Sequence, residues 1–169
     1  KGDHYRQYLP NGDIILQPKC FVIGQLTQPL EIAATGQTNI IAVRFQHFGF
    51  DPFSNLPLSF FENRAIHLEE VFGKKGSELE HEILKGIDTT RSIQLIETFL
   101  LRMLQNKSIA DRLIAATIDL IVEANGKYSI IELSEHVQTK RRKLERKFAA
   151  KVGLTPKYLS RVIRMQSTL

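Results

Sequence analysis

One stretch of the sequence decides the fold, and it reads SIIELSEHVQTKRRKLERKFAAKVGLTP over residues 129–156. Ser129 and Glu132 have the spacing of a capping box, in which each side chain accepts a hydrogen bond from the other residue's backbone N–H at the start of a helix. This spacing predicts a short helix that begins after Ser129 and ends near Val137. A brief turn at residues 138–139 is expected to follow it.

A basic helix is predicted from that turn to about Val152. Leu144 and Phe148 lie four residues apart, so they share the inner face of this helix. Gly153 is placed to end it in the left-handed conformation, and Thr155-Pro156 begins another helix as N-cap and first helical residue. A short helix, a tight turn and a helix with an apolar inner face and a basic outer face are what a DNA-binding helix-turn-helix requires, because its second helix enters the major groove.

Positive charge is concentrated in the same region. Residues 139–164 hold ten basic residues and one acidic residue, Glu145, which gives +10 − 1 = +9. The rest of the chain has 23 − 10 = 13 basic and 18 − 1 = 17 acidic residues, or −4, and the whole chain carries +5. A basic end on an acidic body is typical of proteins that bind a polyanion. A solvated helix face is the alternative interpretation of such a charge run.

The first half of the chain has the pattern of short strands. Four runs rich in Ile, Val, Leu and Phe are separated by turn residues, and they cover residues 13–17, 21–25, 29–34 and 39–45. Runs of this length and spacing predict a small sheet, sandwich or barrel. The last run is almost continuously apolar, which is typical of a strand buried on both faces.

Helical signals take over after residue 50, where short helical turns are expected first. A helix is then predicted over residues 77–84, ended by Gly86. Asp88 has the position of an N-cap for a longer helix that runs to about Gln105. That longer helix is a candidate for a dimer surface or for a brace between domains, and the sequence leaves both open.

A further capping box is expected at Ser108 and Asp111, opening a helix that stops before Asn125-Gly126. Residues 106–107 are the best candidate for a linker. The chain is therefore predicted to have an α+β fold, with a first domain over residues 1–106 and a second over residues 107–169.

The second domain resembles the DNA-binding domain of AraC/XylS-type transcription regulators. The resemblance rests on Lys140-Arg-Arg142-Lys-Leu144-Glu-Arg146-Lys-Phe148, on Val152-Gly153-Leu154-Thr155-Pro156-Lys157 and on residues 161–166. More weakly, residues 9–12, 21–25 and 41–45 resemble the β-rich sensory domain found upstream in one branch of that family. The resemblance implies a small cupin-like β-rich domain with following helices, then an all-α helix-turn-helix subdomain.

Two features depart from the family pattern. The family has a serine where this chain has Lys140, so Thr139 is expected to cap the basic helix instead. The family's DNA-binding domain also has two helix-turn-helix units joined by a long helix, and the chain is expected to stop inside that joining helix. With one unit, this fragment is expected to bind DNA only weakly.

The resemblance implies roles for individual side chains. Base-edge contacts are expected from Arg142, Glu145 and Arg146, because arginine bonds guanine in a bidentate manner and glutamate accepts from cytosine. Phosphate contacts, which fix register without reading sequence, are expected from Ser129, Lys140, Arg141, Lys143, Lys147 and Thr155. Surface solubilisation is the alternative role for any single arginine here.

The β-rich half is where a small-molecule signal is expected to act. Its interior is predicted to be lined by Ile15, Cys20, Val22, Ile41, Val43 and Phe45. An apolar cavity among them would hold a small molecule, although the same residues would equally fill a core. The leading hypothesis is thus a ligand-responsive regulator that binds double-stranded DNA. A homodimer is a candidate form of it, because paired half-sites suit dimers.

No feature of the sequence predicts an enzyme, and neither a cofactor nor a metal ion is expected. The five histidines, which include His47, are scattered and form no metal-binding motif. Cys20 is the single cysteine, which excludes an internal disulfide, and no run is long enough to span a membrane. A cytoplasmic protein is expected. The competing hypothesis is a cupin-like small-molecule-binding or enzymatic domain with a basic helical tail that does not read DNA.

Overall fold

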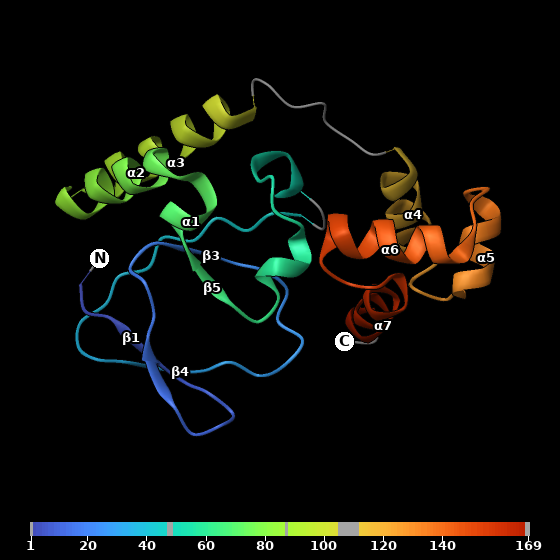
Figure 1. The fold of residues 1–169 in the computed structure, drawn as a ribbon, viewed down its shortest axis with the longest axis horizontal. Coiled ribbons are helices and arrows are strands. Elements are labelled where there is room, and N and C mark those ends of the chain that lie inside the picture. The colour runs from blue at the N-terminus through green and yellow to red at the C-terminus, as the bar shows by residue number, and fades with distance from the viewer. Residues whose placement is uncertain (1, 47–48, 87, 105–111, 168–169) are drawn as a thin grey trace. The chain divides into compact units, whose positions relative to one another are not determined.

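The computed structural model describes residues 2–46, 49–86, 88–104 and 112–167, and it has the predicted α+β class (Figure 1). The chain forms two compact units. Unit 1 comprises Lys1–Arg44, Phe53–Leu56 and Phe61–Asn106, and unit 2 comprises Phe45–Pro52, Pro57–Phe60 and Lys107–Leu169. The expected capping box at Ser108 and Asp111, the expected linker at residues 106–107, the predicted helix end at Gln105, and His47 lie outside the described residues.

Unit 1 contains two small antiparallel sheets. Strands β1 (Tyr5–Tyr8), β2 (Ile14–Leu16) and β4 (Glu31–Ala34) form a sheet of order β2-β1-β4. Strands β3 (Phe21–Ile23) and β5 (Ala65–His67) form a second pair. The sequence predicts β2, β3 and β4 but misses β1 and β5. Phe61 and Ile66, which are 1% and 2% exposed, belong to the core beside the second pair.

The prediction of a buried strand over residues 39–45 is wrong. This stretch runs without regular structure after one isolated bridge between Thr38 and Gly2. Ile40 and Val43 are 65% and 49% exposed. Apolar composition favours a strand only where a neighbouring strand supplies the backbone hydrogen bonds. Here the last strand before this stretch, β4, ends at Ala34, and residues 39–45 pair with no strand.

Unit 1 continues into three helices. Helix α1 is Leu68–Phe72, α2 is Lys74–Lys85 and α3 is Thr89–Leu104. Helix α2 thus begins before the predicted residue 77 and ends, as expected, at Gly86. Asp88 caps α3 as predicted, because its carboxylate accepts the backbone N–H groups of Thr90 and Arg91 at 3.1 Å each.

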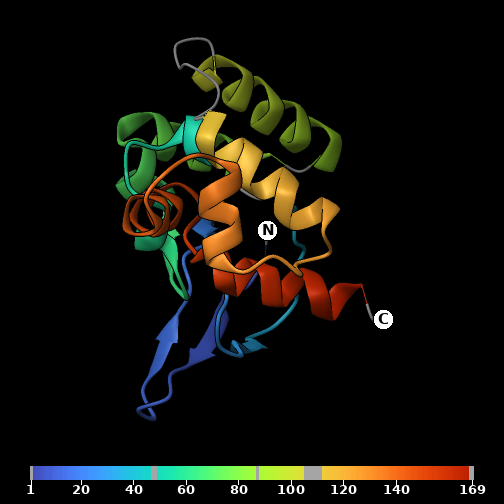
Figure 2. The same cartoon turned by 90° about the vertical axis from the view of Figure 1, so that its right-hand side faces the viewer.

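Unit 2 is a bundle of four helices with two short segments from the first half of the chain. The helices are α4 (Arg112–Glu123), α5 (Ile130–His136), α6 (Arg141–Val152) and α7 (Pro156–Gln166), and the segments hold the 3₁₀ turns Asp51–Phe53 and Leu58–Phe61 in part. Helix α6 packs against α4, α5 and α7, and α4 packs against α7 (Figure 2). The shared core consists of Ile114, Ile118, Ile121, Leu133, Leu144, Phe148, Val152 and Leu159.

Candidate nucleic-acid interface

The buried side chains of α6 determine which face of that helix points outward. Leu144 and Phe148 are 0% exposed and Val152 is 1% exposed, and the three recur every four residues along one face. They join Leu133 of α5 and Ile114 of α4 in the core of unit 2. Because this stripe is fully buried, the side chains on the opposite side of α6 must face solvent.

The short helix α5 is fixed at its start by the predicted capping box. The Ser129 hydroxyl accepts the Glu132 backbone N–H at 3.3 Å, and a Glu132 carboxylate oxygen accepts the Ser129 N–H at 2.7 Å. The hydrogen bonds from Ser129 hold the pKa of Glu132 below its ordinary value. The prediction of this helix start from the sequence is confirmed.

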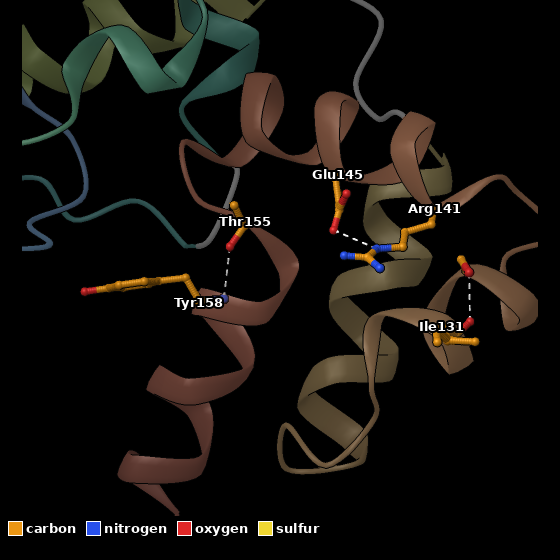
Figure 3. Close-up of polar contacts among 6 residues, drawn as sticks. Ile131, Arg141, Glu145, Thr155 and Tyr158 are labelled. Carbon is orange, nitrogen blue, oxygen red and sulfur yellow. Dashed lines mark hydrogen bonds and ion pairs between the residues drawn. The ribbon is translucent and has the colours of Figure 1, made fainter.

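The turn between α5 and α6 reverses the chain at Gln138, which has a φ of 48°. The Thr139 N–H donates to the Ser134 carbonyl at 2.9 Å and closes the turn. Ser134 is 8% exposed, and its hydroxyl donates to the Ile131 carbonyl at 2.8 Å (Figure 3). A small residue therefore stands at this buried point of α5.

The expectation that Thr139 caps α6 is wrong. Lys140 occupies the N-cap position, with φ −70° and ψ 134°, and no side chain caps the helix. Thr139 is already part of the closed turn, and lysine carries no acceptor with which to cap a helix. The first turn of α6 therefore begins with backbone N–H groups that no side chain has satisfied.

The outer face of α6 presents the two arginines that the sequence selected as base readers. Arg142 and Arg146 are both exposed and lie four residues apart, away from the buried stripe. Within the part of the chain that the structure describes, neither makes a hydrogen bond or an ion pair. Both guanidinium groups are therefore available to a partner.

Glu145 is engaged by its neighbour one turn away. The Arg141 Nε donates to the Glu145 carboxylate at 3.1 Å, and the two side chains point toward each other (Figure 3). The pair is exposed, so the geometry is held only weakly. The Glu145 carboxylate is therefore engaged by Arg141 in this structure.

The side chains expected at phosphates surround the outer face of α6. Lys140 and Lys143 are exposed like Arg141, whereas Lys147 is half-buried. Thr155 caps α7 as predicted, accepting the Tyr158 N–H at 3.2 Å (Figure 3). Ser129 and Thr155 are both exposed, so each lies at the surface at the N-terminus of a helix.

The six expected pocket residues of the β-rich half differ in exposure and in the unit to which they belong. Ile15 lies on β2, at the edge of its sheet, and is 44% exposed, while Val43 is 49% exposed. Phe45 belongs to unit 2, where its ring contacts Phe50 edge-on at 5.2 Å. Only Cys20, Val22 and Ile41 are half-buried in unit 1.

A groove is present elsewhere in unit 1, between α2 and α3. It has a volume of about 470 Å³ and an apolar floor formed by Leu79, Leu95, Phe99 and Met103. Among its charged residues, Glu78, Glu82 and Lys75 line it from α2, and Arg91 and Arg102 line it from α3. The sequence pointed to α3 as a candidate contact surface but gave no sign of this division of charge.

The polar groups near β3 and β5 include Cys20, His67 and Glu80. Burial, followed by the nearby Glu80 carboxylate, raises the pKa of the Cys20 thiol, which disfavours the nucleophilic thiolate. His67 is bonded to Glu80 at 2.9 Å through its Nε2 and accepts the Glu69 N–H through its Nδ1. Among the described residues, no group of three or more His, Cys, Asp or Glu side chains is placed to hold a metal ion.

One contact in unit 2 was not predicted. The Lys151 ammonium group on α6 donates to both carboxylate oxygens of Asp51, at 3.0 and 2.9 Å. The two residues are 100 positions apart, and no motif or periodicity links them.

Within the described residues, no helix is both long and apolar enough to traverse a bilayer.

The family model of DUF6597, a domain of unknown function, matches residues 2–67. The match covers all five strands that the structure describes and none of its α-helices. No curated protein and no solved structure matches the chain. Residues 2–67 are therefore similar to the DUF6597 domain, and α4–α7 are interpreted from their own geometry.

Proposed function

We propose that the protein is a sequence-specific DNA-binding transcription regulator of the AraC/XylS type. The observation that carries this proposal is the pair of unengaged arginines, Arg142 and Arg146, on the outer face of a helix whose inner face is fully buried. The charge of +9 over residues 139–164, which include α6 and most of α7, produces a field that attracts a polyanion.

In this proposal α6 enters the major groove and α5 supports it from behind. Arg142 and Arg146 contact base edges, with bidentate bonds to guanine as the preferred geometry. Lys140, Lys143 and Lys147 contact phosphates on either side and hold the register. Glu145 accepts from cytosine once Arg141 turns to a phosphate, because an exposed ion pair costs little to exchange.

A small-molecule signal acts on unit 1 in this proposal, since the basic excess lies outside unit 1 and unit 1 has a recognised domain of its own. A ligand that favours one arrangement of the chain would shift DNA binding by its difference in affinity for the two arrangements. A role on DNA would place the protein in the cytoplasm.

A second copy of the chain is the proposed partner of the groove between α2 and α3. In an antiparallel two-fold arrangement, α3 of each copy lies in the groove of the other. Arg91 and Arg102 of one copy then meet Glu78 and Glu82 of the other, while the apolar floor is covered. The same surface on each copy thus carries both the acidic and the basic residues that pair with the other copy.

Salt-dependent binding to duplex DNA tests the regulator proposal. With a labelled duplex pool of random sequence, the logarithm of affinity should fall with the logarithm of salt by about 0.9 for each phosphate contact. Lys143→Ala should reduce that slope by about one contact, whereas the control Arg6→Ala, on β1 of unit 1, should leave it unchanged.

A slope near zero would contradict the regulator proposal. It would favour the competing hypothesis, a small-molecule-binding domain whose basic tail does not read DNA. An equal loss of slope in Lys143→Ala and Arg6→Ala would show that binding follows net charge and not the outer face of α6.

A further inference from the structure

Two short segments of the first half of the chain belong to the unit that contains the helix-turn-helix. Residues 45–52 and 57–60 are part of unit 2, whereas residues 53–56 between them and the chain from Phe61 onward are part of unit 1. The backbone therefore enters unit 2 twice before it reaches α4. Each entry is covalently joined on both sides to unit 1.

The first of these two segments, residues 45–52, is bound to α6 by an ion pair. Asp51, at the start of the 3₁₀ turn Asp51–Phe53, binds Lys151 in the last turn of α6 through both of its carboxylate oxygens. The two side chains are 24% and 41% exposed, so the pair is only partly screened by water. Lys151 is one turn beyond Lys147, beside the buried stripe and away from Arg142.

The second entry lies against the corner at which α6 turns into α7. Gly153 ends α6 in the left-handed conformation, with φ 81° and ψ −2°. A Cβ at this position would lie 3.1 Å from the Leu58 carbonyl oxygen, so the backbones of Leu58 and Gly153 are in close contact. Leu58 itself is 8% exposed.

We propose that residues 50–60 act as a brace that couples unit 1 to the corner between α6 and α7. The ion pair holds one end of the brace and the packing of Leu58 holds the other. A change in unit 1 that displaces these residues would loosen the end of α6 and the start of α7. It would thereby change the position in which α6 of the helix-turn-helix is held. The brace acts on the position of α6 and not through its outer face.

Hydrogen exchange of the full chain, without DNA, tests this brace, so its outcome is independent of the proposed DNA binding. Asp51→Asn should raise exchange about threefold to fivefold both in residues 50–60 and in residues 149–158, because a partly exposed ion pair contributes that much to a local opening equilibrium. Asp119→Asn, which removes an exposed carboxylate from α4 of the same unit, is the matched control and should change neither peptide.

A perturbation inside unit 1 tests the coupling itself. Gly24→Ala would place a Cβ 2.7 Å from that of Phe61, the residue directly after the second entry. It should raise exchange in residues 149–158, and it should do so less in the Asp51→Asn background, because the brace is already weakened there. If residues 149–158 respond to neither variant, or to Asp51→Asn alone, the coupling is contradicted.

Discussion

At the scale of single residues, Gly153 meets two separate constraints. Its φ of 81° is a conformation that strains residues with a Cβ, and an added Cβ would lie in tight contact with the Leu58 carbonyl oxygen, at 3.1 Å. The two exposed arginines of α6 are in the opposite situation from this glycine. Arg142 and Arg146 are constrained by nothing within the described protein, which is expected of groups that serve a partner.

Gly153→Ala is predicted to lower the free energy of unfolding by about 1–2 kcal/mol because of backbone strain. The tight contact with Leu58 should add a further loss to this amount. Gly12→Ala is the matched control, because Gly12 also has a positive φ, of 89°, but nothing lies within 4 Å of its added Cβ. Urea denaturation followed by circular dichroism measures both. Equal losses in the two variants would show that Leu58 adds no constraint at the corner.

At the scale of the elements, local chemistry predicted the start of α5, the end of α6 and the start of α7. Ser129 with Glu132, Gly153 and Thr155-Pro156 mark their ends through hydrogen bonds or backbone angles that involve only near neighbours in sequence. Such signals survive folding because no distant residue is needed to complete them. The exposed arginines of α6 were predicted for the same reason, since their face follows from Leu144 and Phe148.

The capping box makes the stability of α5 depend on pH. Hydrogen bonds from Ser129 lower the pKa of Glu132 from an ordinary value of 4.5, so the stabilisation is present above that pH and is lost as the pH falls through the lower pKa of the folded state. Ser129→Ala should cost about 1 kcal/mol at neutral pH through loss of the hydroxyl cap. It should leave most of this pH dependence in place, because alanine keeps the backbone N–H that donates to Glu132.

Glu132→Gln provides the control, since glutamine retains an acceptor but does not titrate. Denaturation curves at neutral pH and below pH 4.5 should show a larger loss of stability for the wild type than for Glu132→Gln. The same loss in both proteins would contradict the role of this carboxylate, and would assign the acid sensitivity to other groups.

The elements of unit 1 were predicted less well, because their formation depends on distant partners. Residues 39–45 have the composition of a strand, yet no edge pairs with them over that length. Strand β1 has two polar residues between two tyrosines and shows no apolar run, but it pairs with both β2 and β4. The contact between Asp51 and Lys151 is the extreme case, since 100 residues separate its members.

At the scale of the whole molecule, charge and contact surfaces divide between the two units. The basic excess lies in unit 2, and the groove with acidic and basic sides lies between α2 and α3 of unit 1. If each function stays within its unit, variants of one should leave the other intact. A dimer formed through unit 1 would contain two copies of α6.

A charge exchange across the groove tests the dimer. Glu82→Arg and Arg102→Glu should each weaken self-association about fivefold or more, because each places like charges together in the paired copies. The double variant should recover most of the loss, since it restores an attractive pair. Sedimentation equilibrium measures all four proteins. The proposed surface would be contradicted by a wild type that stays monomeric. It would also be contradicted by a double variant whose loss of self-association free energy equals the sum of the losses in the two single variants.

The central claim, that the outer face of α6 reads DNA sequence, is tested most directly by selecting binding sites from a pool of randomised duplexes. The wild type should enrich a defined motif, and Arg146→Ala should bind that motif about 1–3 kcal/mol more weakly and lose its preference at one position. Arg6→Ala, exposed on β1, should select the wild-type motif unchanged. If the wild type enriches no motif, or if Arg146→Ala selects the same motif with the same affinity, α6 is not a reading helix.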